Sequence, residues 1–356
     1  MRTYSSADAL KRHPEITDRP VSVTALRAHF TPSPPTSARA LLIRMGPFDP
    51  AQDGFPFTNN FQTSTAQGVE LARMFRDEVI EAVTPGVIKR YTKVMSDLSF
   101  DALPGIPGGE VGLPDLVVSQ VGLRVGTELT AQIIDLRIDP FLPGARCGGM
   151  AFAGYDFYLL GRPVGGFGSS PPNTGELGDY IFARLIDSLD LNAKKFLDWL
   201  VELHVLPGLN KVAKAVLVAE VGTISGPVGA LIADFVASQG SIFDLGGAGS
   251  LLARTKDEWT IIKRRLDEQA AWPIGLIYGD TKNPFDQHQV LATGYTDNGL
   301  GEATLRIWNS NELRVPDNIR LDFRGKRLQV SGFNDPNGHT IRGIFAEEYT
   351  PKRPPL

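Results

Sequence analysis

The spacing of apolar residues changes near position 272, and this change separates a helical region from a β-rich one. Between 177 and 268, apolar side chains recur every three or four positions, as on one face of a helix. From 272 to 349, apolar and polar side chains alternate in short runs, as in the strands of an antiparallel sheet. The predicted strands are 272–278, 290–295, 303–308, 319–323, 328–333 and 341–345. Turn-forming residues occur between them at 296–299, 324–326 and 334–338.

The helical region is predicted to contain several helices. They are a helix over 177–206, two short helices between 209 and 238, and an amphipathic helix over 250–268. The most apolar stretch, 212–236, is interrupted by Lys214, Glu220, Asp234 and the pair Gly226-Pro227. Because a membrane span needs about 20 uninterrupted apolar residues, we expect a buried helical hairpin there and no membrane span.

The N-terminal part of the chain has a less regular pattern. Residues 1–38 are polar and contain several prolines, which predicts an arm that packs weakly. After the arm come a predicted strand at 40–45, a phenylalanine-rich loop at 48–63, and a helix at 67–83 that ends by Pro85 and Gly86. Apolar residues alternate over 117–138, which predicts two or three strands. This stretch leads directly into a loop that holds the single cysteine.

These patterns predict a fold of the α+β class with three parts. Residues 1–38 form the arm, 39–140 an N-terminal β-containing region, and 141–356 a region organised around the cysteine loop. The third part is expected to have a helical middle at 177–268 and a β-rich end at 272–349. Helices and antiparallel strands that occupy separate stretches of the chain are typical of this class.

Composition narrows the class of protein. The chain has 356 residues, 42% hydrophobic and 21% charged, as in a globular protein with a core. A net charge of −4 gives no electrostatic reason to expect a nucleic-acid partner. One cysteine excludes an internal disulfide and a multi-cysteine zinc site, and we expect neither a metal nor a cofactor. The N-terminus lacks the apolar segment of a signal peptide, so a cytoplasmic location is expected by default.

The single cysteine, Cys147, lies where a loop is expected to become a helix. Pro143 and Gly144 precede it, and apolar residues at helical spacing follow over 148–160. A thiol at a helix start faces unpaired backbone N–H groups and the positive end of the helix dipole. Both favour the thiolate, which is the form that attacks carbonyl groups. The alternative is a packing role, because free cysteine is among the most buried residue types.

A histidine and an asparagine far downstream favour chemistry over packing. His288 begins a predicted strand, and Asn309 ends the next one. The turn at 297–299 makes these strands neighbours, so the start of one lies beside the end of the other. The oxygen of Asn309 can then accept a hydrogen bond from the imidazole and hold one tautomer. A thiol, a base and a group that fixes the base are what a cysteine hydrolase needs.

The order of a cysteine at a helix start, a histidine at a strand start and an asparagine after the next strand resembles the papain-like cysteine peptidase superfamily. The spacing between Cys147 and His288 lies within the family's range of roughly 130–150 residues, and Asn309 lies beyond it. The stretch 288–297 is most similar to the bacterial branch that cuts double-glycine leader peptides. Members of that branch have a histidine, an apolar strand ending in Gly-Tyr, an acidic turn, and a strand ending at an aspartate, whose position Asn309 occupies.

The resemblance implies a papain-like fold, with the nucleophile at a helix start and the base and orienting group on an antiparallel sheet. It implies a catalytic triad of Cys147 as nucleophile, His288 as base and later acid, and Asn309 as orienting group. The implied activity is that of a thiol protease or related hydrolase acting on a peptide or small-molecule acyl substrate through a thioester. Transfer of the acyl group to an amine is equally compatible. We expect Cys147 to be partly exposed and to alkylate rapidly near neutral pH.

The chain also departs from the family pattern. Gly148 and Gly149 follow the cysteine where the family has tryptophan, and Phe141 stands where the family has a glutamine that donates to the oxyanion. Loss of one such donor costs about 10²–10³ in rate. Gln287 and Gln289 are candidate substitutes, and the backbone N–H of the cysteine would supply part of the oxyanion hole. The alternative is a non-catalytic binding protein on the same scaffold, in which Cys147→Ala would leave ligand binding unchanged. A buried, unreactive Cys147 would contradict the enzyme.

Other potential motifs have structural explanations. The remaining histidines, expected to be solvated or structural, are His13, His29, His204 and His339. The glycine-rich stretch 246–250 lacks the spacing of a phosphate-binding loop, so we expect a helix start there. The acidic turn at 297–299 lacks the ligand spacing of an EF-hand, so we expect a hairpin turn without calcium.

Overall fold

The computed structural model describes much of the chain. The described residues are 46–69, 71, 84–96, 99–100, 111–112, 117–121, 123–124, 128, 146–224, 248–282, 284–333, 335 and 337–355. The chain divides into two units, Met1–Leu42 and Ile43–Leu356, and every described residue belongs to the second. The predicted arm at 1–38 and the predicted strand at 40–45 therefore lie outside the described residues.

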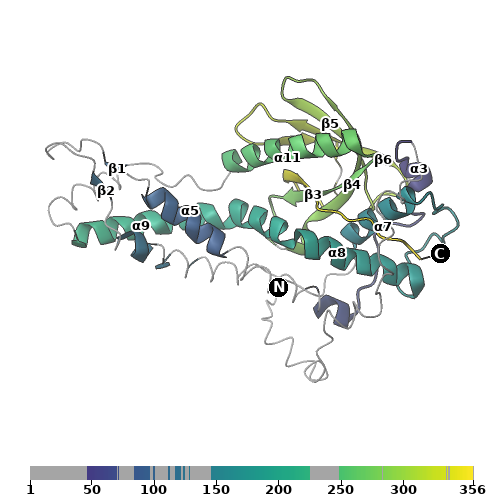
Figure 1. The fold of residues 1–356 in the computed structure, drawn as a ribbon, viewed down its shortest axis with the longest axis horizontal. Helices are drawn as coiled ribbons and strands as arrows, with labels where there is room; N and C mark the ends of the chain where they lie inside the picture. The colour runs from purple at the N-terminus through teal and green to yellow at the C-terminus, as the bar shows by residue number, and fades with distance from the viewer. Residues whose placement is uncertain are drawn as a thin grey trace. The chain divides into compact units, whose positions relative to one another are not determined.

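A six-stranded antiparallel sheet, curved into a half-barrel, forms the C-terminal part of the fold (Figure 1). The strands are β3 (Trp272–Tyr278), β4 (His288–Asp297), β5 (Glu302–Trp308), β6 (Pro316–Asp322), β7 (Gln329–Ser331) and β8 (Ile341–Ala346). Their order across the sheet is β7-β6-β5-β4-β3-β8. The strands predicted from alternation are confirmed, with bounds that shift by a few residues. The α+β class is confirmed as well.

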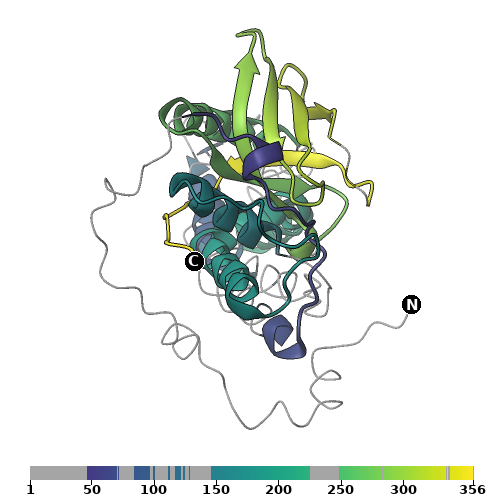
Figure 2. The ribbon, with the colours of Figure 1, turned by 90° about the vertical axis from the view of Figure 1, so that its right-hand side faces the viewer.

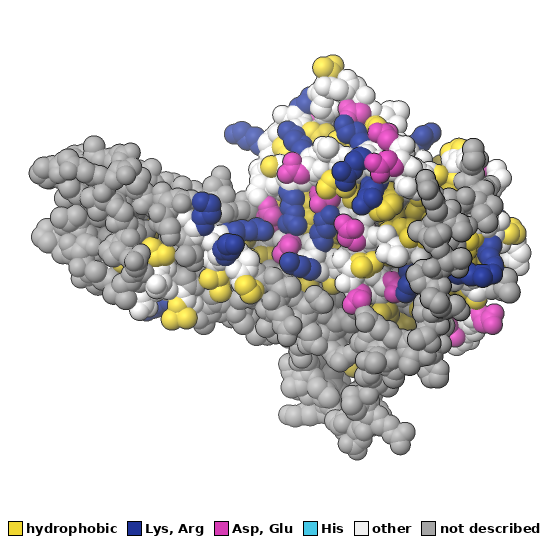
Figure 3. Space-filling model, viewed as in Figure 1, with side chains coloured by type: hydrophobic (Ala, Val, Ile, Leu, Met, Phe, Trp, Pro, Cys, Tyr) yellow, Lys and Arg dark blue, Asp and Glu magenta, His cyan; other side chains and the backbone are white. Residues whose placement is uncertain are grey.

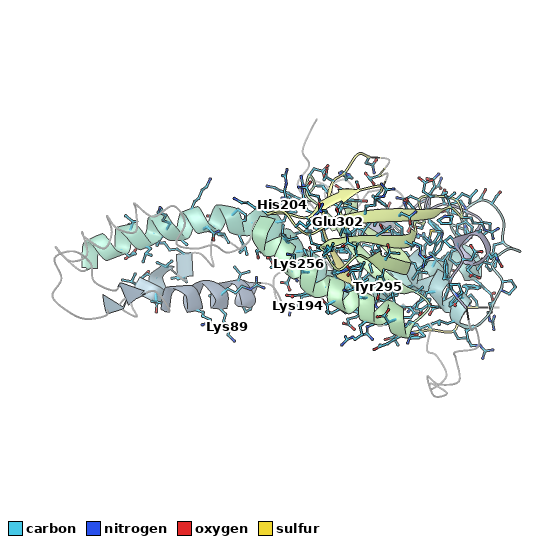
Figure 4. All side chains as sticks on the ribbon, turned by 90° about the horizontal axis from the view of Figure 1, so that it is seen from above. Lys89, Lys194, His204, Lys256, Tyr295 and Glu302 are labelled. Atoms are coloured by element: carbon cyan, nitrogen blue, oxygen red, sulfur yellow. The ribbon has the colours of Figure 1, made fainter. Side chains whose placement is uncertain are left out.

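Three of the described helices contact the sheet. They are α7 (Cys147–Leu159), α8 (Gly175–Leu200) and α11 (Ala248–Glu268), and a fourth helix, α9 (Leu206–Ile224), continues the chain after α8. The sheet lies over α7 and α8, and α11 runs beside β8 (Figures 1 and 2). Basic and acidic side chains are interspersed on the face shown in Figure 3. The exposed Lys256 on α11 and the half-buried Tyr295 on β4 are labelled in Figure 4.

Helix α7 is buried along its whole length, because apolar residues and glycines make up most of it and its one charged residue, Asp156, is paired with Arg184. A Cβ atom added at Gly149 would overlap the backbone carbonyl of Ile181 in α8. A Cβ atom added at Gly154 would overlap the ring of Trp308 at the end of β5. The missing side chains thus allow α7 to fit between α8 and the sheet.

The prediction of a helix ending near residue 206, followed by two short helices, is wrong as far as Ile224. Helix α8 passes directly into a π-helical turn, Val201–Val205, and then into α9. Pro207 lies just after that turn, and proline has no N–H to donate to a preceding helical turn. The wider π turn accommodates this break in the hydrogen-bond ladder, so the helix continues. The rest of the predicted hairpin lies outside the described residues.

For the N-terminal region, one prediction is confirmed in part and another is wrong. The helix predicted at 67–83 is helical where it is described, at 67–69 and 71, and its other residues lie outside the described part of the chain. Pro85 and Gly86, expected to end that helix, lie instead in the first turn of α5 (Thr84–Ser96), where proline is favoured. Residues 117–121 are helical rather than extended. Val117 and Val121 are buried one helical turn apart, and Leu123 is 68% exposed. The described β-structure of this region is a two-residue pairing of β1 (Ser99–Phe100) with β2 (Val111–Gly112).

A segment at 46–62, which we call the strap, lies across the ends of α7 and β5. It contains the short helix α3 (Pro50–Asp53), which is capped by Asp49. Phe48 packs against Trp308, and Phe55 contacts Phe157 edge to face. The strap thus covers the same buried surface that α7 and β5 share.

Replacing Gly149 with alanine should destabilise the fold, since the added methyl group meets a backbone carbonyl that cannot rotate away. Overpacking of this kind costs about 1–3 kcal/mol. Urea unfolding should show a lower midpoint for Gly149→Ala. The control is Gly166→Ala, at an exposed loop glycine with nothing near its added Cβ, which should change stability by less than about 0.5 kcal/mol. Equal midpoints for the two variants would contradict the close contact between the helices.

Candidate functional site

Cys147 is the first residue of α7, so the predicted placement at a helix start is confirmed. The preceding residue, Arg146, is buried and donates from its side chain to the carbonyl of Gly178 at 3.3 Å. Its guanidinium also lies 4.5 Å from the centroid of the Phe61 ring. These contacts hold the start of α7 against both the strap and α8.

The expectation of a partly exposed thiol with a favoured thiolate is wrong for this structure. Cys147 is 7% exposed, and burial raises the pKa of its thiol to about 11. The backbone N–H groups of Gln289, Gly148 and Cys147 itself lower the pKa, as expected at a helix start, while the nearby Glu347 raises it further. Because desolvation is the largest contribution, the resting thiol is protonated near neutral pH.

His288 and Asn309 lie together as predicted. His288 is the first residue of β4, and Asn309 follows the last residue of β5. The Nε2 atom of His288 lies 2.8 Å from Oδ1 of Asn309. Both side chains are buried. The hairpin between the two strands thus brings His288 and Asn309 into contact, as the short turn between the predicted strands indicated.

A backbone group fixes the orientation of this pair. The N–H of Asn311 donates to Oδ1 of Asn309 at 3.0 Å. A backbone N–H can only donate, so the atom facing it must be the oxygen of the Asn309 amide. The same oxygen then accepts from Nε2–H of His288, which leaves Nδ1 as the basic ring nitrogen. The structure therefore supports one tautomer of the imidazole.

Burial also lowers the pKa of His288, and the hydrogen bond to Asn309 and the charge of Asp335 offset this only in part. A neutral imidazole and a neutral thiol are therefore the resting forms near pH 7. Phe333 packs beside the imidazole, with ring centroids 6.4 Å apart. The surroundings of both groups disfavour charge, which argues against a preformed thiolate–imidazolium pair.

Cys147 approaches β4 at the residue after His288. Its Sγ atom lies 4.0 Å from Oε1 of Gln289, at the limit of a sulfur hydrogen bond. Neighbouring residues of a strand point to opposite faces, so Gln289 and His288 lie on different faces of β4. No hydrogen bond joins the sulfur to the imidazole in the described site. The three predicted residues are thus gathered around the start of β4, with the thiol directed at Gln289.

Gln289 belongs to a buried polar cluster that sequence reasoning missed. Its amide nitrogen donates to Oε1 of Glu347 at 2.7 Å and to Oγ of Ser188 at 3.2 Å. The amide nitrogen of Gln289, which would have to donate to an oxyanion, is therefore already engaged. Gln287, the other candidate donor, accepts the backbone N–H of Tyr278 through its Oε1 atom. The signal that could have revealed Glu347 is a carboxylate directly after the apolar run 344–346.

The glycine after the cysteine has a steric explanation. A Cβ atom at Gly148 would overlap both Oε1 of Gln289 and Oγ of Ser188. The start of α7 therefore requires glycine here because it lies against the polar cluster, whereas the family pattern has a large aromatic residue. Phe141, which replaces the family's glutamine, lies outside the described residues.

The other described histidines and the acidic turn have structural neighbours of their own. His339 contacts Asp280 through Nδ1 at 3.0 Å, and His204 lies in the π turn (Figure 4). Asp297 accepts the N–H of Gly299, which confirms the predicted hairpin turn. His13 and His29 are outside the described residues.

Comparisons with known proteins do not extend these observations. No protein-family model matches the chain, and neither the curated proteins nor the solved structures include a match. Across the described parts of the chain, no group of three or more His, Cys, Asp or Glu side chains is arranged to hold a metal ion. None of the helices described is long and apolar enough to cross a membrane.

Glu347 should make stability depend on pH. Burial raises its pKa from 4.5 to about 8, so the folded chain keeps a proton that the unfolded chain releases. The contribution of this carboxyl group to stability therefore falls as the pH rises from about 4.5 to about 8. Glu347→Gln cannot ionise, so it should equal wild type near pH 4.5 and exceed it at pH 8 by a few kcal/mol, on the order of 1.4 per pKa unit.

Urea unfolding at a series of pH values measures this difference, and Glu348→Gln is the matched control. Glu348 is the exposed neighbour, so its variant should follow the wild-type curve at each pH. A Glu347→Gln curve parallel to wild type over the whole range would show that the buried carboxyl group titrates normally.

Proposed function

We propose that this chain is a cysteine-dependent acyl hydrolase or acyltransferase with a papain-like arrangement of its reacting groups. Cys147 is the nucleophile, His288 the base and Asn309 the group that orients the base. The observation that carries the proposal is the hydrogen bond between His288 and Asn309, fixed by the N–H of Asn311. These hydrogen bonds hold the imidazole in one tautomer and leave Nδ1, the basic nitrogen, without a bond to Asn309. A histidine that served only in packing would not need such an arrangement.

The proposed reaction begins from neutral groups. The first step requires the thiol of Cys147 to turn from Gln289, its neighbour in the resting site, toward the imidazole. As Sγ then forms a bond to the substrate carbonyl carbon, Nδ1 of His288 takes the thiol proton and the carbonyl π electrons move to the oxygen. The tetrahedral intermediate then expels the amine or alcohol, which takes the proton back from the imidazole. The remaining thioester is attacked by water or an amine, again with His288 as base, and the thiol is regenerated.

Proton transfer during attack is the form of catalysis that suits the electrostatics of this site. The raised pKa of Cys147 and the lowered pKa of His288 both oppose a resting ion pair. General-base transfer needs no such pair, because charge develops only as the sulfur attacks. The oxyanion is assigned to the backbone N–H of Cys147, since the start of α7 presents N–H groups and the positive end of the dipole. Gln289 is already engaged by Glu347.

The second candidate is a non-catalytic binding protein on the same scaffold. The observations that favour it are the 7% exposure of Cys147, its raised pKa and the absence of a hydrogen bond from its sulfur to His288 in the described site. Under this proposal the thiol only fills space between the start of α7 and Gln289 of β4. No acyl group would then be transferred by the chain.

The rate of Cys147 alkylation by iodoacetamide, measured from pH 5 to pH 12, separates the two candidates. An enzyme should show a component below the thiol's own titration at about pH 11, because His288 removes the proton during attack. His288→Ala should lower the rate at pH 7 by at least about 10²-fold, the lower range for general-base catalysis. His204→Ala replaces a half-buried histidine of the π turn and should leave the rate unchanged.

A single titration near pH 11 that is unaltered in His288→Ala would support the binding protein and contradict the enzyme. A difference between the two histidine variants would contradict the packing role of the thiol.

Replacing Asn309 with aspartate should move the same pH profile. A carboxylate beside Nε2 favours the protonated imidazole, so the pKa of His288 should rise. The acid limb of the alkylation profile should then shift to higher pH. Asn309→Ala keeps neither a charge nor a hydrogen bond to the imidazole, so it should lose the His288-dependent component of the rate. Two profiles that match wild type would show that Asn309 does not act on the base.

A further inference from the structure

We infer that Asn59 of the strap is a positioning residue that sets the nucleophile and the base of the proposed reaction at a fixed distance. The inference rests on the proposed function, and it adds a residue that neither the sequence pattern nor the family resemblance indicates. Asn59 is half-buried and touches neither Cys147 nor His288 in any hydrogen bond of the described site. Asn59 acts through hydrogen bonds to the residue before Cys147 and to the two residues after Asn309.

On one side, Asn59 holds the residue before the nucleophile. The backbone N–H of Arg146 donates to Oδ1 of Asn59 at 3.1 Å. This N–H lies outside the internal hydrogen bonds of α7, because Arg146 is the N-cap position of the helix. Asn59 therefore satisfies a group that the helix itself leaves unpaired, and it fixes where α7 begins.

On the other side, Asn59 holds the loop after the orienting residue. Its backbone N–H donates to the carbonyl of Ser310 at 2.8 Å, and its Nδ2 donates to Oδ1 of Asn311 at 3.3 Å. The N–H of Asn311 in turn donates to Oδ1 of Asn309, which contacts His288. A continuous path of hydrogen bonds thus runs from the backbone at Arg146 to the imidazole.

The side chain at this position must both accept and donate. Asparagine does so with one planar amide, whose oxygen takes the N–H of Arg146 while its nitrogen reaches Asn311. Aspartate would keep the acceptor, but its second oxygen would face the side-chain oxygen of Asn311. Alanine would remove both contacts. Both substitutions therefore break the contact with Asn311, and Asn59→Asp does so while keeping the acceptor for Arg146.

The strap is held in place independently of Asn59. Phe57 and Phe61 on either side of it are buried, with ring centroids 6.0 Å apart, and Phe61 lies under the guanidinium of Arg146. Further along, the N–H of Gln62 donates to Oδ1 of Asn173 at 2.7 Å. Loss of the Asn59 side chain should therefore loosen the site without releasing the strap.

The test compares Asn59→Ala and Asn59→Asp with Asn173→Ala, which also removes an asparagine contact to the strap but lies away from Cys147 and His288. Each variant is made with and without His288→Ala in the full chain. The difference in iodoacetamide alkylation rate at pH 7 between the two backgrounds is the His288-dependent component. Both Asn59 variants should lower this component by about tenfold or more, because a misplacement of about 1 Å can cost 10²-fold. Asn173→Ala should retain it.

A second readout separates positioning from a general loss of structure. The ¹⁵N chemical shifts of the His288 ring report which nitrogen carries the proton. Wild type and Asn173→Ala should show Nε2–H, whereas Asn59→Ala should show a mixture of tautomers as Asn311 and Asn309 loosen. Urea midpoints should fall by a similar amount in Asn59→Ala and Asn173→Ala, since each loses side-chain hydrogen bonds to the same segment.

Equal losses of the alkylation component in Asn59→Ala and Asn173→Ala would overturn the inference, because the effect would then follow from the strap as a whole. If wild type itself lacks a His288-dependent component, the proposed function fails. The role of Asn59 is then tested only by the ¹⁵N measurement of the His288 tautomer. In that case an unchanged Nε2–H tautomer in Asn59→Ala overturns the inference, and a mixture of tautomers supports it.

Discussion

The burial of helix α7 between α8 and the sheet is the constraint on which the rest of the fold and the site depend. The helix carries glycine where it meets the backbone of α8 and the ring of Trp308, and any larger side chain there would separate the layers. Because the first residue of this helix is Cys147, the same contact brings the thiol against β4. Packing and chemistry are thus set by one element, and glycine is the residue that permits both.

A buried ion pair near the other end of α7 ties the C-terminal residues to the same helix. Asp156 contacts Arg184 of α8 at 2.7 Å and accepts hydrogen bonds from Tyr349 and from the backbone of Lys352. A carboxylate this deep is tolerated because its oxygens are paired and hydrogen-bonded. The segment after β8 is therefore attached to α7 and α8. Glu347, at the start of that segment, then lies beside Gln289 and near Cys147.

The polar groups around Cys147 and those around His288 differ in character. Behind the thiol, Gln289 and Glu347 form a buried cluster in which desolvation raises the pKa of both the thiol and the carboxyl group. Around the imidazole, Asn309 and the N–H of Asn311 fix one tautomer without adding charge. A site built this way suits a reaction in which charge appears only during attack, and it explains why the helix start alone does not produce a thiolate.

The sequence by itself determined the strands of the C-terminal sheet and the order of Cys147, His288 and Asn309 along the chain. Alternation predicted the strands, and one hairpin was enough to place His288 beside Asn309, because both residues lie on neighbouring strands joined by a short turn. Periodicity was misleading where two patterns coincide, as at 117–121, and where a π turn carries a helix past Pro207. Local propensity cannot decide such positions, since tertiary packing selects between the alternatives.

Only the tertiary structure decided the protonation of the thiol and the position of Asn59. The pKa of Cys147 depends on burial and on Glu347 and Gln289, which lie far along the chain and act through space. Asn59 is separated by 87 positions from Arg146 and by 252 from Asn311, so no local pattern could have connected them. Desolvation and long-range hydrogen bonds arise only when the chain is packed, so they cannot be read from the order of residues alone.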